Sequence, residues 1–142
     1  MRTTLLCRTA AQTEELAGAR QNDRYLPGVE LPRDLRIRTL GADPDQFGRA
    51  DLLLLAVPSK YIGEAIDELR RLRVPDRAGI VSLTKGLVAP DGATPTALLE
   101  AQFGPERVAC VGGPAHALEM VESGAGLVCA SRSESLAHRV AE

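Results

Sequence analysis

The sequence has no long apolar run and no block of like charge. Its 142 residues carry 17 basic and 19 acidic side chains, for a formal net charge of −2. A balanced charge without a basic stretch does not favour binding to nucleic acid or to an anionic membrane. No window approaches the ~20 apolar residues of a membrane-spanning helix, and the N-terminus lacks the apolar core of a signal peptide.

Cysteine and lysine are both scarce. The three cysteines, Cys7, Cys110 and Cys129, are far apart, and each lies in an apolar, strand-like run. Because no two of them are closely spaced, neither a metal site nor a redox motif is indicated, and we expect buried, reduced thiols and a cytoplasmic protein. Among the 17 basic residues only Lys60 and Lys85 are lysines, which makes Lys85 the more conspicuous.

The stretch Asp51–Gly86 has the pattern strand, turn, helix, loop, strand. Its first strand, expected at Asp51–Val57, is apolar after the first residue, as in a strand covered on both faces of a parallel sheet. Ser59 is placed to cap the helix that follows, and Gly79–Leu83 reads as a second buried strand. The apolar positions of that helix have helical spacing: Ile62, Ala65, Ile66, Leu69 and Leu72. This is a βαβ unit, and sheets built from such units bind ligands beyond the carboxyl ends of their strands.

The remaining elements continue the alternation of strands and helices. Further strands are expected at Thr3–Cys7, Leu35–Leu40, Val108–Val111 and Gly126–Ala130. Further helices are expected from Thr9 to about Gln21, from Thr94 to about Phe103, from about Ala115 to Gly124, and from a capping box at Ser131 and Glu134 into the C-terminus. The prolines and glycine of Asn22–Pro32 predict a loop, and alternation in Leu35–Leu40 predicts an edge strand. The pattern predicts one domain of α/β class with a mostly parallel sheet.

Three positions in the first half of the chain favour a nucleotide ligand. Arg8 follows the first strand, where an arginine can stack on adenine or hold a 2′-phosphate, although the spacing alone favours a solvated arginine. Tyr25, in the proline- and glycine-containing loop, is placed either to pack against a cofactor or to cover a sheet edge. Pro58 and Ser59 lie in the turn that would adjoin a nicotinamide, or serve only to begin a helix.

Two strand ends in the second half favour an anionic or carbonyl ligand. Lys85 follows a buried strand and precedes Gly86, a combination that suits a phosphate or a polarised carbonyl, although an isolated Lys-Gly pair is a weak signal. The segment 112–117 (GGPAHA) repeats this arrangement with a turn and a helix start. His116 is either a general acid–base group or structural, and His138 is expected on the surface.

Four motifs, taken in order, resemble one family. The runs NDRYLPGVELP, ADLLLLAVPS, SLTKGL and GGPAHALE are similar to the N-terminal domain of bacterial NAD(P)-dependent glycerol-3-phosphate dehydrogenase, over the whole chain. The resemblance implies a doubly wound, mostly parallel Rossmann-like sheet. It also implies reversible hydride transfer between NAD(P)H and dihydroxyacetone phosphate, giving glycerol 3-phosphate for phospholipid synthesis.

The resemblance assigns roles residue by residue. Arg8 and Tyr25 match cofactor-contacting positions at the adenosine end, Ala117 matches another cofactor contact, and Lys85 matches a lysine that contacts both cofactor and substrate. Pro58 is expected beside the cofactor from its place in the turn after the strand. Gly113 and Ala115 match substrate-contacting positions, although Ala115 replaces a frequent serine. No residue matches the family's catalytic lysine, which lies in a helical C-terminal domain, and the resemblance implies no metal.

Two departures from the family bear on activity: we expect the helical C-terminal domain with its catalytic lysine to be absent, and the strand that carries the glycine-rich turn to be absent as well. The chain has no G-x-G-x-x-G, whose strand would lie between Thr3–Cys7 and Asp51–Val57. Those two strands are therefore expected either to keep unpaired inner edges or to pair with each other. We expect residues 1–142 to be a partial NAD(P)-binding domain that lacks catalysis in isolation. A related dehydrogenase of another substrate and a non-catalytic α/β binding module remain alternatives, and a homodimer of the full-length form stays open.

Overall fold

The computed structural model describes residues 2–114 and 116–142. Contacts along the chain define two compact units, Met1–Gln46 and Phe47–Glu142, which we call the N-terminal unit and the C-terminal unit. The N-terminal unit contains β1 (Thr4–Cys7), α1 (Ala10–Ala19), β2 (Gln21–Asn22), β3 (Leu26–Glu30) and β4 (Arg36–Thr39). The C-terminal unit contains β5 (Leu52–Leu55), α2 (Ile62–Arg71), β6 (Gly79–Ser82), α3 (Pro95–Phe103), β7 (Val108–Gly112), α4 (Ala117–Ser123), β8 (Val128–Ser131) and α5 (Glu134–Ala141), with 3₁₀ turns η1 (Ser59–Tyr61) and η2 (Pro105–Arg107).

The N-terminal unit is a parallel strand pair covered by one helix. Strands β1 and β4 pair in register, with Leu5 opposite Ile37. Helix α1 starts where Thr9 accepts a hydrogen bond from the Gln12 N–H at 3.2 Å, and its buried Leu16 packs with Ile37 and Cys7. The predicted start of this helix at Thr9 and the predicted edge strand around Ile37 are confirmed.

The predicted loop at Asn22–Pro32 is wrong, because part of it forms a hairpin. Strands β2 and β3 pair antiparallel, with Gln21 opposite Glu30 and a register shift before Asn22. The pairing is short and irregular, and a two-stranded ribbon with such a shift tolerates Pro27, which cannot donate to a ladder.

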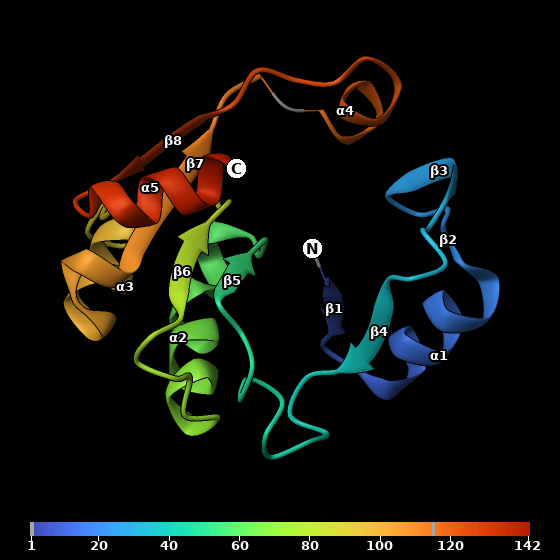
Figure 1. Cartoon of the computed structure of the whole chain (residues 1–142), viewed down its shortest axis with the longest axis horizontal. Coiled ribbons are helices and arrows are strands. Elements are labelled where there is room, and N and C mark those ends of the chain that lie inside the picture. Colours follow the sequence, from blue (N-terminus) through green and yellow to red (C-terminus); the bar gives the residue numbers. More distant parts are fainter. Residues whose placement is uncertain (1, 115) are drawn as a thin grey trace. The chain divides into compact units, whose positions relative to one another are not determined.

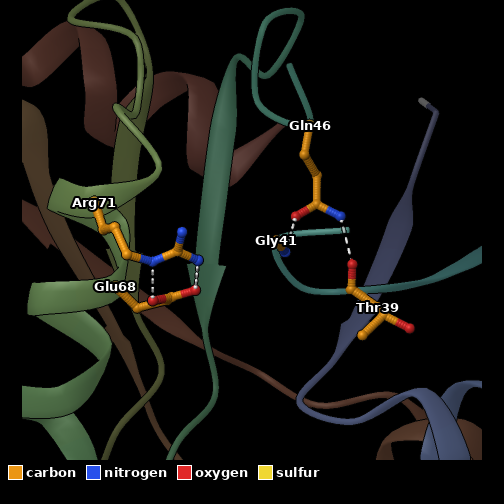
Figure 2. Close-up of polar contacts among 5 residues, drawn as sticks. All are labelled: Thr39, Gly41, Gln46, Glu68 and Arg71. Carbon is orange, nitrogen blue, oxygen red and sulfur yellow. Dashed lines mark hydrogen bonds and ion pairs between the residues drawn. The ribbon is translucent and has the colours of Figure 1, made fainter. Parts of the chain in front are cut away.

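A side-chain amide stabilises the loop after β4. Gln46 accepts a hydrogen bond from the Gly41 N–H and donates one to the Thr39 carbonyl oxygen, both at 2.8 Å (Figure 2). One amide group thus satisfies a backbone donor and a backbone acceptor, much as a neighbouring strand would. The residues that follow, around Phe47, form a series of turns.

The C-terminal unit is a four-stranded sheet with helices on both faces (Figure 1). The strand order is β5-β6-β7-β8; the first three strands are parallel, and β8 runs antiparallel to β7. On one face Ile62 and Ile66 of α2 and Leu99 of α3 pack against Ile80 and Val108. On the other face, Leu136 of α5 packs against Val81 and Ala109. The predicted α/β class with a doubly wound, mostly parallel sheet is confirmed.

Local signals fixed some helix starts and missed others. Thr94 caps α3 by accepting from the Ala97 N–H at 3.1 Å, as predicted. Ser59 does not cap α2, because the chain enters that helix through the 3₁₀ turn η1. Ser131 does not cap α5 either: Ser133 accepts from the Leu136 N–H, while the Ser131 hydroxyl donates to the Val108 carbonyl oxygen at 2.7 Å.

Burial differs between the two central strands. All four residues of β6 are buried, as predicted for Gly79–Leu83. Strand β5 was expected to be covered on both faces, but Leu54 is 57% exposed. Within the described residues, β1 pairs with β4 in the N-terminal unit, and β5 pairs with β6 at one end of the sheet of the C-terminal unit. None of the helices in the described residues has the length and apolar character needed to cross a membrane.

Candidate functional site

The carboxyl ends of three parallel strands bring the predicted residues of the C-terminal unit together. Strand β5 leads into Pro58 and Ser59, β6 into Lys85, and β7 into Gly113. Because β5, β6 and β7 are hydrogen-bonded neighbours, these turns lie at one edge of the sheet. This edge, defined by Pro58, Ser59, Lys85, Gly86 and Gly113, is called the carboxyl edge below.

Hydrogen bonds beyond the regular ladder hold the first two turns together. The Leu83 N–H donates to the Leu55 carbonyl oxygen at 2.9 Å. One residue later the Thr84 hydroxyl donates to the Val57 carbonyl oxygen, also at 2.9 Å. A methyl group built on Gly86 would lie 3.9 Å from the Ser59 hydroxyl oxygen, so the turn after β5 adjoins the turn after β6.

Lys85 links the second turn to the third. Its side chain is exposed, and its Nζ lies 3.5 Å from the Gly113 carbonyl oxygen, a long hydrogen bond. One carbonyl contact leaves the ammonium with further protons to donate, since a lysine carries three. Lys85 therefore presents a positive charge at an edge where the backbone is open to a ligand.

Gly113 has a conformation that requires glycine. Its φ is +142°, and a Cβ there would lie 2.9 Å from the Gly126 carbonyl oxygen and 3.3 Å from the Leu127 side chain. The returning chain before β8 thus passes directly against Gly113. A side chain at this position would push apart the two segments that shape this end of the carboxyl edge.

The remaining predicted residues after β7 are less well defined. Ala117 begins α4, which is exposed along its length. Among the described residues, the side-chain hydrogen bond of Lys85 goes to Gly113 and not to Ala117. Ala115 lies outside the described residues. His116 is exposed and makes no side-chain cap hydrogen bond to α4, and His138 is exposed, as expected.

Arg8 and Tyr25 belong to the N-terminal unit. Arg8 is exposed directly after β1, and Tyr25 lies in the turn between β2 and β3 with 67% of its surface exposed. The Arg24 guanidinium lies 5.2 Å from the centre of the Tyr25 ring, a cation–π distance. Both predicted adenosine-side contacts are therefore accessible, and their roles stay predictions.

Sequence reasoning missed the hydroxyl groups beside Lys85. Ser82 is 1% exposed and accepts a hydrogen bond from the Thr84 N–H at 3.3 Å. Thr84 is half-buried and bonds across to β5. A hydroxyl directly before a Lys-Gly pair at a strand end was the available signal, but its partner lies 27 residues away in the chain.

The cysteines are free thiols, as expected. Cys7 is buried, whereas Cys110 and Cys129 are half-buried, so the expectation of full burial is correct for one of the three. Burial raises the pKa of the Cys129 thiol, with a smaller contribution from Cys110. The described residues contain no group of three side chains suited to hold a metal ion.

The carboxyl edge is suited to bind one end of a dinucleotide rather than the whole molecule. Pro58, Lys85 and Gly113 are exposed, and Gly86 at φ +87° keeps the backbone free of a side chain. A nicotinamide or a phosphate-bearing substrate can approach such a surface closely. The glycine-rich turn that usually cradles the pyrophosphate is not in the sequence, so the edge supplies no such cradle.

Comparison with known proteins decides the family. A family profile described as NAD-dependent glycerol-3-phosphate dehydrogenase N-terminus matches residues 1–137. The chain belongs to this family. The resemblance drawn from the four motifs is thereby confirmed, and the family's description agrees with the expected NAD(P) cofactor.

Individual relatives of this glycerol-3-phosphate dehydrogenase family support the assignment. The chain is 39% identical over 142 residues to glycerol-3-phosphate dehydrogenase [NAD(P)+] of Parafrankia sp., covering 98% of this chain and 42% of the relative. It is 35% identical over 122 residues to the protein of that name from Alcanivorax borkumensis, covering 85% of this chain and 35% of the relative. The chain thus spans well under half the length of these curated relatives.

A solved structure agrees at the level of the fold. The crystal structure of glycerol-3-phosphate dehydrogenase from Coxiella burnetii superposes with a TM-score of 0.83 at 21% identity, covering 96% of this chain and 41% of that one. At this identity the likeness concerns the Rossmann-type arrangement of strands and helices. It agrees with the fold class given by the sheet of the C-terminal unit.

Proposed function

We propose that this chain supplies the cofactor-binding half of an NAD(P)-dependent glycerol-3-phosphate dehydrogenase. The observation that carries the proposal is the carboxyl edge, where Lys85 lies 3.5 Å from the Gly113 carbonyl oxygen in a chain of this family. The proposed reaction is reversible hydride transfer between NAD(P)H and dihydroxyacetone phosphate. Its product, glycerol 3-phosphate, would serve phospholipid synthesis in the cytoplasm.

Lys85 has the central role in this proposal. When bound, NAD(P)H supplies the hydride; the Lys85 ammonium holds the oxygen-rich substrate next to it by charge and hydrogen bonds. Gly113 and Ala115 line the substrate, and Pro58 and Ala117 contact the cofactor. Gly86 supports this arrangement because it has no side chain, and the space beside it holds only the Ser59 hydroxyl oxygen, 3.9 Å from a built Cβ, so that a ligand can approach the backbone.

The adenosine end of the cofactor is proposed to bind the N-terminal unit. Arg8 offers a guanidinium that can stack on adenine or pair with a 2′-phosphate, which favours NADP. Tyr25 offers an exposed ring for the same group.

The chain is proposed to bind the cofactor without catalysing the reaction. No residue in it matches the family's catalytic lysine, so a proton donor for the carbonyl oxygen is not assigned here. We propose residues 1–142 as a partial NAD(P)-binding domain, and a homodimer for the full-length form of the enzyme.

The test is a titration of the 142-residue chain with NADPH and with glycerol 3-phosphate, followed by fluorescence and calorimetry. Lys85→Gln should weaken glycerol 3-phosphate binding by about tenfold or more, because a charge-assisted hydrogen bond is lost. Lys60→Gln is the matched control, since it removes the same charge from the only other lysine, which follows Ser59 at this edge but whose Nζ lies over the Tyr61 ring, 4.8 Å from its centre. Equal binding by the two variants, or no binding of either ligand at millimolar concentration, would refute the proposal.

A further inference from the structure

Thr84 lies where β6 stops and the turn to Lys85 begins. The β5–β6 register ends with Leu55 opposite Ser82, and the Leu83 N–H makes the last backbone hydrogen bond, to Leu55. At Thr84 the backbone N–H turns instead to the Ser82 hydroxyl at 3.3 Å. The Thr84 hydroxyl then donates to the Val57 carbonyl oxygen at 2.9 Å, so a side chain continues the tie between the strands after the backbone has left the ladder.

This hydrogen bond joins the two turns that matter for binding. Val57 directly precedes Pro58, and Thr84 directly precedes Lys85. A lysine side chain has many rotamers, so its ammonium is held in place only if the backbone that carries it is fixed. Gly86, which follows at φ +87°, adds backbone freedom on the other side of Lys85.

We propose that Thr84 is a positioning residue for Lys85, its hydroxyl fixing the turn after β6 to the turn after β5 so that the ammonium reaches Gly113. Neither the resemblance nor the family assignment gives this residue a role. The ordering of Lys85 follows from the hydrogen bonds alone, whereas its consequence for substrate binding rests on the proposed function.

The scarcity of lysine makes the proposal measurable. Reductive methylation with ¹³C-formaldehyde labels Lys60, Lys85 and the N-terminal amine, and a methylated amine keeps its positive charge. Lys85 is then observed directly by its methyl signal in the chain without ligand. Lys60, whose Nζ lies 4.8 Å from the centre of the Tyr61 ring, reports on the turn after β5, at the other end of the Thr84 hydrogen bond.

Three variants separate positioning from general stability. Thr84→Val keeps the shape of the side chain and removes the hydroxyl, and Thr84→Ser keeps the hydroxyl. The control, Ser131→Ala, removes another hydroxyl-to-carbonyl hydrogen bond of 2.7 Å in the same unit, at the amino end of β7. It should lower stability without reaching the carboxyl edge.

We expect Thr84→Val to shift and sharpen the Lys85 methyl signal toward that of a free side chain and to raise the Lys85–Gly86 amide mobility in ¹⁵N relaxation. Thr84→Ser should restore both, and Ser131→Ala should leave both as in the unaltered chain. Binding of glycerol 3-phosphate should weaken roughly fivefold in Thr84→Val alone.

Two results have separate meanings. A Lys85 signal in Thr84→Val that matches the unaltered chain, or one that moves equally in Ser131→Ala, would overturn the positioning role. If glycerol 3-phosphate moves no signal in the unaltered chain, the proposed function fails, while a Lys85 shift confined to Thr84→Val still supports the positioning role.

Discussion

Gly113→Ala provides a sharp test of the geometry at the carboxyl edge. The new Cβ would lie 2.9 Å from the Gly126 carbonyl oxygen, which is backbone and cannot rotate away. In addition, an alanine would have to adopt φ +142°. A residue forced into such a backbone region costs about 1–3 kcal/mol. We therefore expect Gly113→Ala to lower the free energy of unfolding by about 2 kcal/mol.

Gly63→Ala is the matched control within the same unit. Gly63 lies in the first turn of α2, and a Cβ there would meet nothing within 4 Å. Because glycine is a poor helix former, this same chemical change should stabilise the unit by about 0.5 kcal/mol. The two substitutions are therefore expected to change stability in opposite directions.

Thermal unfolding by circular dichroism, with hydrogen exchange at the β6 and β7 amides, measures both effects. For a chain of this size, about 2 kcal/mol corresponds to a melting temperature roughly 6 °C lower for Gly113→Ala. Gly63→Ala should raise it by roughly 1–2 °C. If Gly113→Ala has the same melting temperature as the unaltered chain, the close approach of Gly126 and the strained φ are both wrong.

Three further predictions concern other parts of the chain. Arg8→Ala should weaken NADPH binding several-fold more than NADH binding, measured by fluorescence titration; equal losses would remove the case for a 2′-phosphate contact. Burial raises the pKa of the Cys129 thiol, so iodoacetamide at pH 8 should alkylate it more slowly in the folded chain than in urea, as followed by mass spectrometry. The Arg71 side chain donates to the Glu68 carboxylate at 2.5 and 2.8 Å and lowers the pKa of that carboxyl from its ordinary 4.5 (Figure 2). This contribution to stability is present above that ordinary value and lost as the pH falls through the lowered pKa, so Glu68→Gln should lower the urea midpoint slightly at pH 7 and not at pH 3.

Elements whose signals are local were predictable from the sequence. The apolar spacing of α2 identified Ile62, Ile66 and Leu69 as buried, and Thr94 with Pro95 marked the start of α3. In both cases the decisive contacts lie within one or two helical turns. The carboxyl edge was predictable for a related reason, because the order strand-helix-strand dictates where the ends of parallel strands meet.

Features that depend on distant partners were not predictable. Ser131 had the spacing of a capping box, yet its hydroxyl bonds to Val108, 23 residues earlier, and Ser133 caps the helix instead. The exposure of Leu54 depends on what lies beside β5, which a run of leucines does not reveal. Thr84 was overlooked because its hydrogen bond becomes visible only once β5 and β6 are paired.

The open edge of β5 has a consequence for handling the protein. A parallel strand with unpaired N–H and C=O groups and an exposed Leu54 is a template for strands of other molecules. The chain carries few of the usual deterrents there, since Leu52–Leu55 contains neither proline nor charge. Self-association through this edge should therefore limit the solubility of the chain more than its net charge does. Leu54→Lys should raise the concentration at which light scattering detects aggregates, while leaving the β5–β6 pairing intact.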